Sequence, residues 1–268
     1  MAMIVQHNLR AMNSNRMLGV NSATQSKSTE KLSSGYKINR AADDAAGLSI
    51  SEKMRRQIRG LTQASANAQD GISCVQTAEG ALNEVHDMLQ RMNELAVKAA
   101  NGTLQSEDIG YIQSEIDQLA SEIDRTSNDT KFNKMGLLDG SVSEISLQVG
   151  AEEGQTIKLA LEEMSATKLG VDALKISSAA SITTIDTAIQ KVSSFRSALG
   201  AVQNRLEHTI NNLDNVVENT TAAEAQIRDT DMAKEMVKFS NNNILTQAGT
   251  AMLAQANQAN QGVLSLLQ

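Results

Sequence analysis

Residues 61–100, LTQASANAQDGISCVQTAEGALNEVHDMLQRMNELAVKAA, decide the fold of this chain. Two series of every seventh residue run through the stretch, offset by three positions. All twelve members are apolar or glycine: Leu61, Ala68, Val75, Leu82, Leu89 and Ala96, with Ala64, Gly71, Ala78, Val85, Met92 and Ala99. Spacing of three and four residues over several heptads is typical of a coiled-coil seam. We therefore expect one long helix over residues 44–100, spanning roughly 85 Å if straight.

Apolar residues keep the spacing of a helix in two further parts of the chain, which are separated by a stretch where apolar residues alternate. Ile109, Ile112, Ile116, Leu119 and Ile123 follow a short break at residues 101–103, which predicts a second helix folded back antiparallel to the first. Residues 131–141 are expected to form a loop with hydrophobic anchors. Apolar residues then alternate around GAEEG, which predicts a small β-hairpin at about 143–162. Helical spacing returns over 181–228, so the fold class is mainly α: an elongated rod of long antiparallel coiled-coil helices with one small β-hairpin region.

The composition agrees with long helices and excludes several classes of function. The 268 residues contain no proline and only five aromatic residues, 2 Tyr and 3 Phe. A net charge of −7 argues against nonspecific nucleic-acid binding, which needs a basic surface. No apolar run is long enough for a transmembrane helix, so we expect no membrane insertion. The N-terminal MAMIVQHNLR does not resemble a cleaved secretory signal, which indicates either a cytoplasmic protein or export by another route.

The two ends of the chain are weak helix candidates. Residues 1–42 are polar with scattered apolar side chains, and no charged residue follows Lys238. An exposed helix of this kind would be poorly soluble, so we expect the C-terminal segment to be buried against other copies of the chain. The apolar residues expected to carry that burial are Ile244, Leu245, Met252, Leu253, Leu264 and Leu267.

No residue pattern supports catalysis, a cofactor or a metal. His7, His86 and His208 are far apart, and none lies in an HExxH pattern. Cys74 lies beside the seam and is expected to be a small apolar group. Asp43 and the aspartate after it are expected to begin a helix rather than to form an acid–base pair. We therefore expect no enzyme activity.

Four long stretches closely resemble bacterial flagellins. They are LSSGYKINRAADDAAGLSISEKMRRQIRGLTQASANAQDGIS (32–73), QTAEGALNEVHDMLQRMNELAVKAANGT (76–103), RSALGAVQNRLEHTINNL (196–213) and DTDMAKEMVKFSNNNILTQAGTAMLAQANQANQGVLSLLQ (229–268). The resemblance covers nearly the whole chain in the family's order. Its style is that of the short, Clostridia-like flagellins of Gram-positive bacteria, which lack large outer domains.

The resemblance implies an architecture and a set of partners. Residues 1–42 and 227–268 would pair as helices of the inner-tube domain, and residues 43–226 would form the rod-shaped helical domain. The protein would be a structural subunit that polymerises with copies of itself into the extracellular flagellar filament, for swimming motility. It would be exported by the flagellar type III apparatus without a cleaved signal. A flagellar export chaperone would bind the C-terminal segment, and filament cap and hook-junction proteins would be further partners.

The resemblance also implies recognition by a host receptor. LQRMNEL (89–95) is similar to the flagellin segment that vertebrate Toll-like receptor 5 recognises. Arg91 would be the central contact, surrounded by Gln90, Glu94 and Leu95, with Glu115 approaching from the neighbouring helix. Interfaces within the filament would account for the exposed residues equally well. Two alternatives stay open for the whole chain: a hook–filament junction protein and another type III-exported coiled-coil protein. An enzyme would need a site that the sequence lacks.

Overall fold

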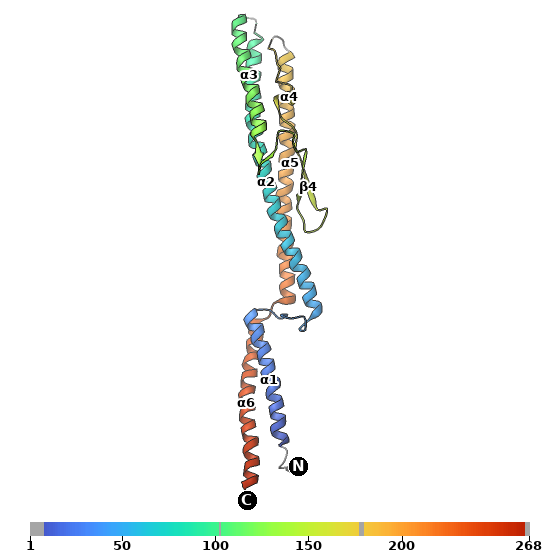
Figure 1. Cartoon of the computed structure of the whole chain (residues 1–268), viewed down its shortest axis with the longest axis vertical. Coiled ribbons are helices and arrows are strands. Elements are labelled where there is room, and N and C mark those ends of the chain that lie inside the picture. Colours follow the sequence, from blue (N-terminus) through green and yellow to red (C-terminus); the bar gives the residue numbers. More distant parts are fainter. Residues whose placement is uncertain (1–7, 102, 177–179, 266–268) are drawn as a thin grey trace. The chain divides into compact units, whose positions relative to one another are not determined.

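A computed structural model describes residues 8–101, 103–176 and 180–265 of the chain. Within these ranges the structure contains six helices and two small antiparallel β-hairpins (Figure 1). The mainly α fold with long antiparallel helices is therefore confirmed. The chain divides into two compact units: one joins the residues up to Arg56 with those from Asn219 onward, and the other is Gln57–Glu218. No helix in the described part is long and apolar enough to cross a membrane.

The first unit contains the pair of terminal helices, α1 (Leu9–Ser34) and α6 (Met232–Ser265). The two run antiparallel, because the Asn8 side chain donates to the carbonyl of Ala256 while Ser28 contacts Glu235. Gly35 ends α1 in the left-handed conformation, at φ 77°. The paired terminal helices that the resemblance implied are thus present.

The second unit is built on most of α2 (Ala45–Ala99), on α3 (Ser106–Asp129) and on most of α5 (Ala180–Arg228). All twelve residues of the predicted seam are buried, from Leu61 to Ala99. Ile112, Ile116 and Ile123 of α3 and Ile185, Val192 and Leu199 of α5 close the same core. The long helix and the helix that folds back on it are confirmed, and α2 begins and ends within one residue of the predicted limits.

The predicted hairpin is also present. Strand β3 (Glu144–Gln148) pairs antiparallel with β4 (Thr156–Ala160). Leu159 is buried in the main core, and the Leu147 side chain lies over Gly71 of α2, where a Cβ would come within 2.5 Å of it. Close approach of the hairpin to α2 therefore requires a residue without a side chain at position 71.

The loop predicted at residues 131–141 contains a second hairpin. Strands β1 (Lys131–Phe132) and β2 (Met135–Gly136) are joined by Asn133 and Lys134, both at positive φ. Such a two-residue turn matches strand twist, but strands of two residues are too short to show alternation in the sequence. Leu137 and Leu138 are buried anchors, as expected. The short helix α4 (Ala166–Leu169) was not predicted either.

Candidate functional site

The inner face of the α1–α6 pair is unusually polar. Its residues are the less exposed ones of each helix, and they recur with the spacing of three and four typical of paired helices. In α1 they are Ala11, Ser14, Leu18, Asn21, Gln25, Ser28 and Leu32; in α6 they are Glu235, Phe239, Asn242, Thr246, Gly249, Leu253 and Ala256. Most of these side chains are small or polar. Among the described side chains of the two helices, only Ser28 and Glu235 are buried.

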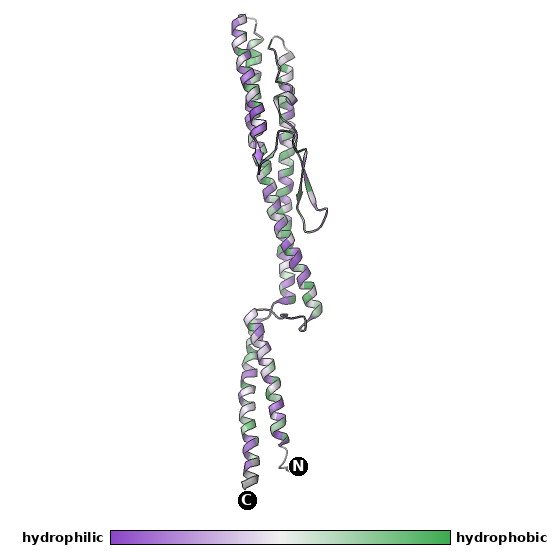
Figure 2. Cartoon of the chain, viewed as in Figure 1, coloured by the Kyte–Doolittle hydropathy of each residue, from purple (hydrophilic) through white to green (hydrophobic). Residues whose placement is uncertain are grey.

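Most of the large apolar side chains of α1 and α6 that the structure describes point outward. Leu9, Met12, Met17 and Val20 of α1 are exposed, as are Met232, Met236, Val237, Ile244, Leu245 and Met252 of α6. Hydrophobic and hydrophilic residues are interspersed along both helices (Figure 2). Among the described residues, large apolar side chains therefore lie on both faces of the pair: four on the inner face, Leu18, Leu32, Phe239 and Leu253, and a larger number on the outer face. Such exposed apolar faces mark a surface that binds another protein.

The structure places the predicted polymer segment on this outward surface. Ile244, Leu245 and Met252 are 63%, 51% and 59% exposed. Leu253 is half-buried on the inner face. The side chain of Leu264, and Leu267 as a whole, lie outside the described residues.

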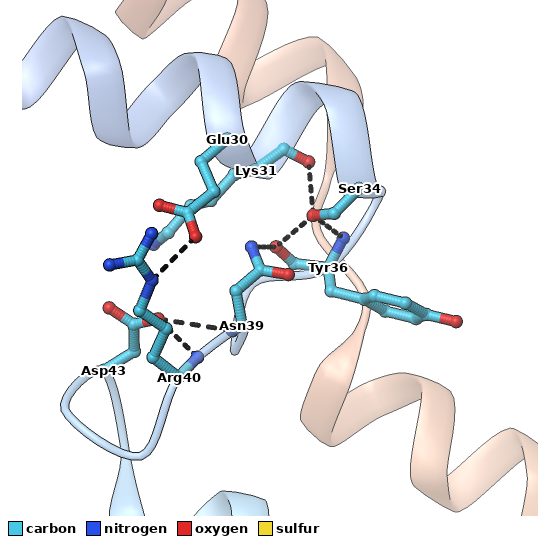
Figure 3. Close-up of polar contacts among 7 residues, drawn as sticks. All are labelled: Glu30, Lys31, Ser34, Tyr36, Asn39, Arg40 and Asp43. Carbon is cyan, nitrogen blue, oxygen red and sulfur yellow. Dashed lines mark hydrogen bonds and ion pairs between the residues drawn. The ribbon is translucent and has the colours of Figure 1, made fainter.

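The loop at residues 35–44, between α1 and α2, is held by its own polar groups (Figure 3). The Asp43 carboxylate accepts from the backbone amides of Arg40, at 3.0 Å, and Asn39, at 3.2 Å. These hydrogen bonds lower the pKa of Asp43. The Arg40 guanidinium reaches back to Glu30 of α1 at 3.0 Å. Asp43 thus organises a loop turn. The predicted role at the start of a helix falls to Asp44 alone, whose carboxylate accepts from the amide of Gly47 in the first turn of α2 at 2.9 Å.

The same loop is tied to the segment between α5 and α6. The amide of Lys37 donates to the carbonyl of Arg228 at 2.7 Å, and Tyr36 forms an isolated β-bridge with Asp229. The Arg228 guanidinium lies 4.7 Å from the centroid of the Tyr36 ring. It also donates to Glu52 of α2 at 3.0 Å. The two connections that lead to the terminal helices therefore hold each other.

A second candidate surface lies between α2 and α3 in the other unit. The Arg91 Nε and Nη2 atoms each lie 3.0 Å from Glu115 Oε1, and its Nη1 lies 3.1 Å from Glu94 Oε2. Hydrogen bonds to Glu115, and then to Glu94, raise the pKa of the guanidinium. All three side chains are substantially exposed. They line a groove of about 580 Å³ together with Leu95, Lys98, Leu104, Asp108, Tyr111 and Ile112.

The five residues proposed for receptor contact differ in position. Arg91, Glu94 and Glu115 form one exposed cluster. Gln90 is exposed beside it, with its amide Nε2 2.8 Å from His86 Nε2. Leu95 is only 3% exposed and belongs to the core, so it lines the groove on the side of the core.

The groove includes one large exposed side chain that sequence reasoning missed. Tyr111 is 74% exposed on α3, one helical turn before Glu115. The apolar residues Ile109, Ile112 and Ile116 face inward, so the helical spacing that predicted α3 could have placed Tyr111 on the outer face.

Two observations concern metal binding and the reactivity of the cysteine. The described residues contain no group of three His, Cys, Asp or Glu side chains that could hold a metal ion. Cys74 is buried, and burial raises the pKa of its thiol, which makes it a poor nucleophile.

Comparison with known proteins finds relatives that match most of this chain. Residues 5–143 match the bacterial flagellin N-terminal helical region, and residues 182–267 match the bacterial flagellin C-terminal helical region. The chain is 55% identical to a flagellin of Halalkalibacterium halodurans and 49% identical to one of Bacillus subtilis. It is 50% identical to the flagellar filament 31.3 kDa core protein of Treponema maltophilum. Each of these alignments covers 99% of this chain and 100% of the relative.

Proposed function

The chain belongs to the bacterial flagellin family, and from that premise we propose how its two surfaces work. Its relatives are structural flagellins, and its role is that of a structural subunit of the flagellar filament, which is extracellular. The observation that carries the proposal is the number of large apolar side chains exposed on the outer face of the α1–α6 pair. Outward residues such as Ile244 and Met252 leave water only when other copies of the chain cover them.

In this proposal residues 1–42 and 227–268 form the inner-tube domain, and residues 43–226 form the rod-shaped helical domain. Among the described residues, the large apolar side chains that are exposed cluster on the terminal helices: ten lie on α1 and α6, whereas Ile50, Val97, Tyr111 and Val216 are scattered over α2, α3 and α5. The rod has a continuous core of its own, from Cys74 to Leu199. The rod therefore folds without neighbours, and the inner-tube helices depend on them.

Filament formation tests the role of the outward face. We expect the variant Ile244→Gln/Leu245→Gln to form few or no filaments after ammonium sulfate seeding, as observed by negative-stain electron microscopy. Gln255→Asn is the matched control, because Gln255 is an exposed polar residue of the same helix, and it should polymerise normally. Normal filaments from the double variant would show that the outward face does not carry assembly.

Before assembly, the exposed apolar face of α6 must be shielded from water by another protein. A flagellar export chaperone would bind the 229–268 segment inside the cell and deliver the chain to the type III apparatus, without a cleaved signal. Filament cap and hook-junction proteins would then contact the subunits at the two ends of the filament. A pull-down should recover the chaperone with the full chain and lose it when residues 229–268 are deleted. Retained binding would place the chaperone site elsewhere.

The groove between α2 and α3 supports a second function, recognition by Toll-like receptor 5 of vertebrates. Arg91 offers a planar set of donors, held in place by Glu94 and Glu115 on either side. Exposed arginines of this kind are common hot spots of protein interfaces. Gln90 flanks the cluster, and Leu95 supports it from the core.

Binding to the receptor ectodomain tests this assignment. Arg91→Ala should weaken binding of the monomer by at least ~10-fold in surface plasmon resonance. Arg125→Ala is the matched control, because Arg125 is also exposed and paired with two acidic residues, Glu122 and Asp129, on α3. Equal affinities for wild type and Arg91→Ala, at equal helical content, would exclude the groove as the receptor site.

A further inference from the structure

The methionines of the chain fall into two groups that differ in exposure. The sequence has 12 methionines, and the structure describes ten of them. Five lie on α1 and α6, and every one of these is exposed: Met12, Met17, Met232, Met236 and Met252. The other five lie on α2, on β2 and just before α4, and none of these is exposed: Met54, Met88, Met92, Met135 and Met164. Within the described ranges, the accessible methionines are therefore those of the terminal helices.

These exposed methionines are spread along the length of the α1–α6 pair. Met232 and Met236 lie in the first two turns of α6, and Met252 lies about four turns later. Met12 lies in the first turn of α1, at the end of the pair where α1 contacts the carbonyl of Ala256. Methionines make up half of the ten large apolar side chains exposed on the two helices. A reaction at their sulfur atoms would therefore change the outer face along its whole length.

Methionine differs from the other apolar residues of this face in its chemistry. Hydrogen peroxide oxidises the thioether to a sulfoxide. The sulfur lone pair forms a bond to one peroxide oxygen as the O–O bond breaks, and the other oxygen takes up the proton and leaves as water. Sulfur loses two electrons and the peroxide gains them, whereas leucine, valine and isoleucine side chains do not react. The chain's one cysteine, Cys74, is buried and does not compete for the oxidant.

Oxidation would turn an apolar contact into a polar one. The sulfoxide oxygen is a strong acceptor that loses its water when a neighbouring molecule covers it, and that loss costs free energy unless a donor replaces the water. We propose that the five exposed methionines of α1 and α6 are an oxidation site for peroxide in the free subunit, and that their sulfoxides keep the subunit out of the filament. This proposal rests on the filament role of the chain. Methionine sulfoxide reductases reverse the reaction, so the block is reversible.

Peptide mass spectrometry of free subunits treated with hydrogen peroxide tests where oxygen is added. The five methionines of α1 and α6 should gain an oxygen atom at least ~10-fold faster than Met92 and Met164, because the latter two are buried. In filaments formed before treatment, the same five should react at least ~10-fold more slowly than in free subunits. Equal rates for exposed and buried methionines, or equal rates in subunits and filaments, would overturn the proposal.

Seeded assembly in ammonium sulfate, followed by electron microscopy, measures the effect on the filament. Oxidised wild-type chain, freed of peroxide, should need at least a ~10-fold higher concentration to form filaments than untreated chain. Treatment with methionine sulfoxide reductases A and B, which together reduce both sulfoxide epimers, should restore assembly. Normal assembly of the oxidised chain would overturn the proposal, and so would a block that the reductases do not relieve.

Leucine substitutions separate the terminal methionines from the others. A variant with all five terminal methionines changed to leucine keeps side chains of similar size, and it should form filaments before and after peroxide treatment. The matched control, Met54→Leu/Met88→Leu/Met135→Leu, keeps the terminal methionines and should stay sensitive to peroxide. Peroxide sensitivity of the terminal variant would overturn the proposal. If that variant fails to assemble untreated, the reductase experiment on the wild-type chain decides. Untreated wild-type chain that forms no filaments would instead refute the filament role itself.

Discussion

The stretch 89–95 combines core and surface residues, and a pair of substitutions separates the two. Leu89 is fully buried in the core of the second unit, whereas Arg91 is exposed two residues later. Replacing a buried leucine by alanine removes its transfer free energy and leaves a cavity, which together cost ~2–5 kcal/mol. Because Leu89 is 0% exposed and lies between α2 and its neighbours, we expect Leu89→Ala to cost about 3 kcal/mol or more.

Urea unfolding of the full-chain monomer, followed by circular dichroism, measures this cost. A loss of ~3 kcal/mol at a slope of ~1–3 kcal/mol per M lowers the midpoint by about 1–3 M. Arg91→Ala should leave the midpoint nearly unchanged, because its ion pairs are exposed to solvent. The expected pattern is therefore loss of stability in one variant and loss of receptor binding in the other. A midpoint for Leu89→Ala within about 0.2 M of wild type would refute the core assignment of this stretch.

Three further predictions concern other parts of the molecule. Loop amides hold the pKa of Asp43 below its ordinary value of ~3.9, so the stability it contributes is present above that value and is lost as the pH falls through the lowered pKa; an NMR titration that gives an ordinary pKa would contradict this. Gly80→Ala should stabilise α2 by up to ~1 kcal/mol, since nothing lies near its Cβ position, whereas Gly71→Ala should gain less or lose stability because its Cβ would meet Leu147; thermal melts with equal gains would be the contrary result. Amides of residues 239–265 should exchange quickly in the monomer and slowly in filaments; strong protection in the monomer would show that the pair folds without neighbours.

The second unit was largely predictable because its core is local and periodic. The heptad residues of α2 are apolar and end up buried, and the alternation around GAEEG produces β3 and β4. The β1–β2 hairpin was missed because each strand has two residues, which leaves no period to detect. The proposal of a receptor site at Arg91 came only from family resemblance. Spacing alone placed Arg91 outside the core but did not bring Glu115 of α3 to it.

The terminal helices were predictable as weak, but the residues on which they meet were not. Polar and apolar residues are spread around both helices, so neither sequence defines one apolar face. The structure places Ser28 and Glu235 inside together with Phe239. Ile244 and Met252 remain outside. Exposed apolar surface on both helices destabilises the pair in water unless another molecule covers it. We therefore expect neighbouring copies of the chain to complete the burial that a single chain leaves unfinished.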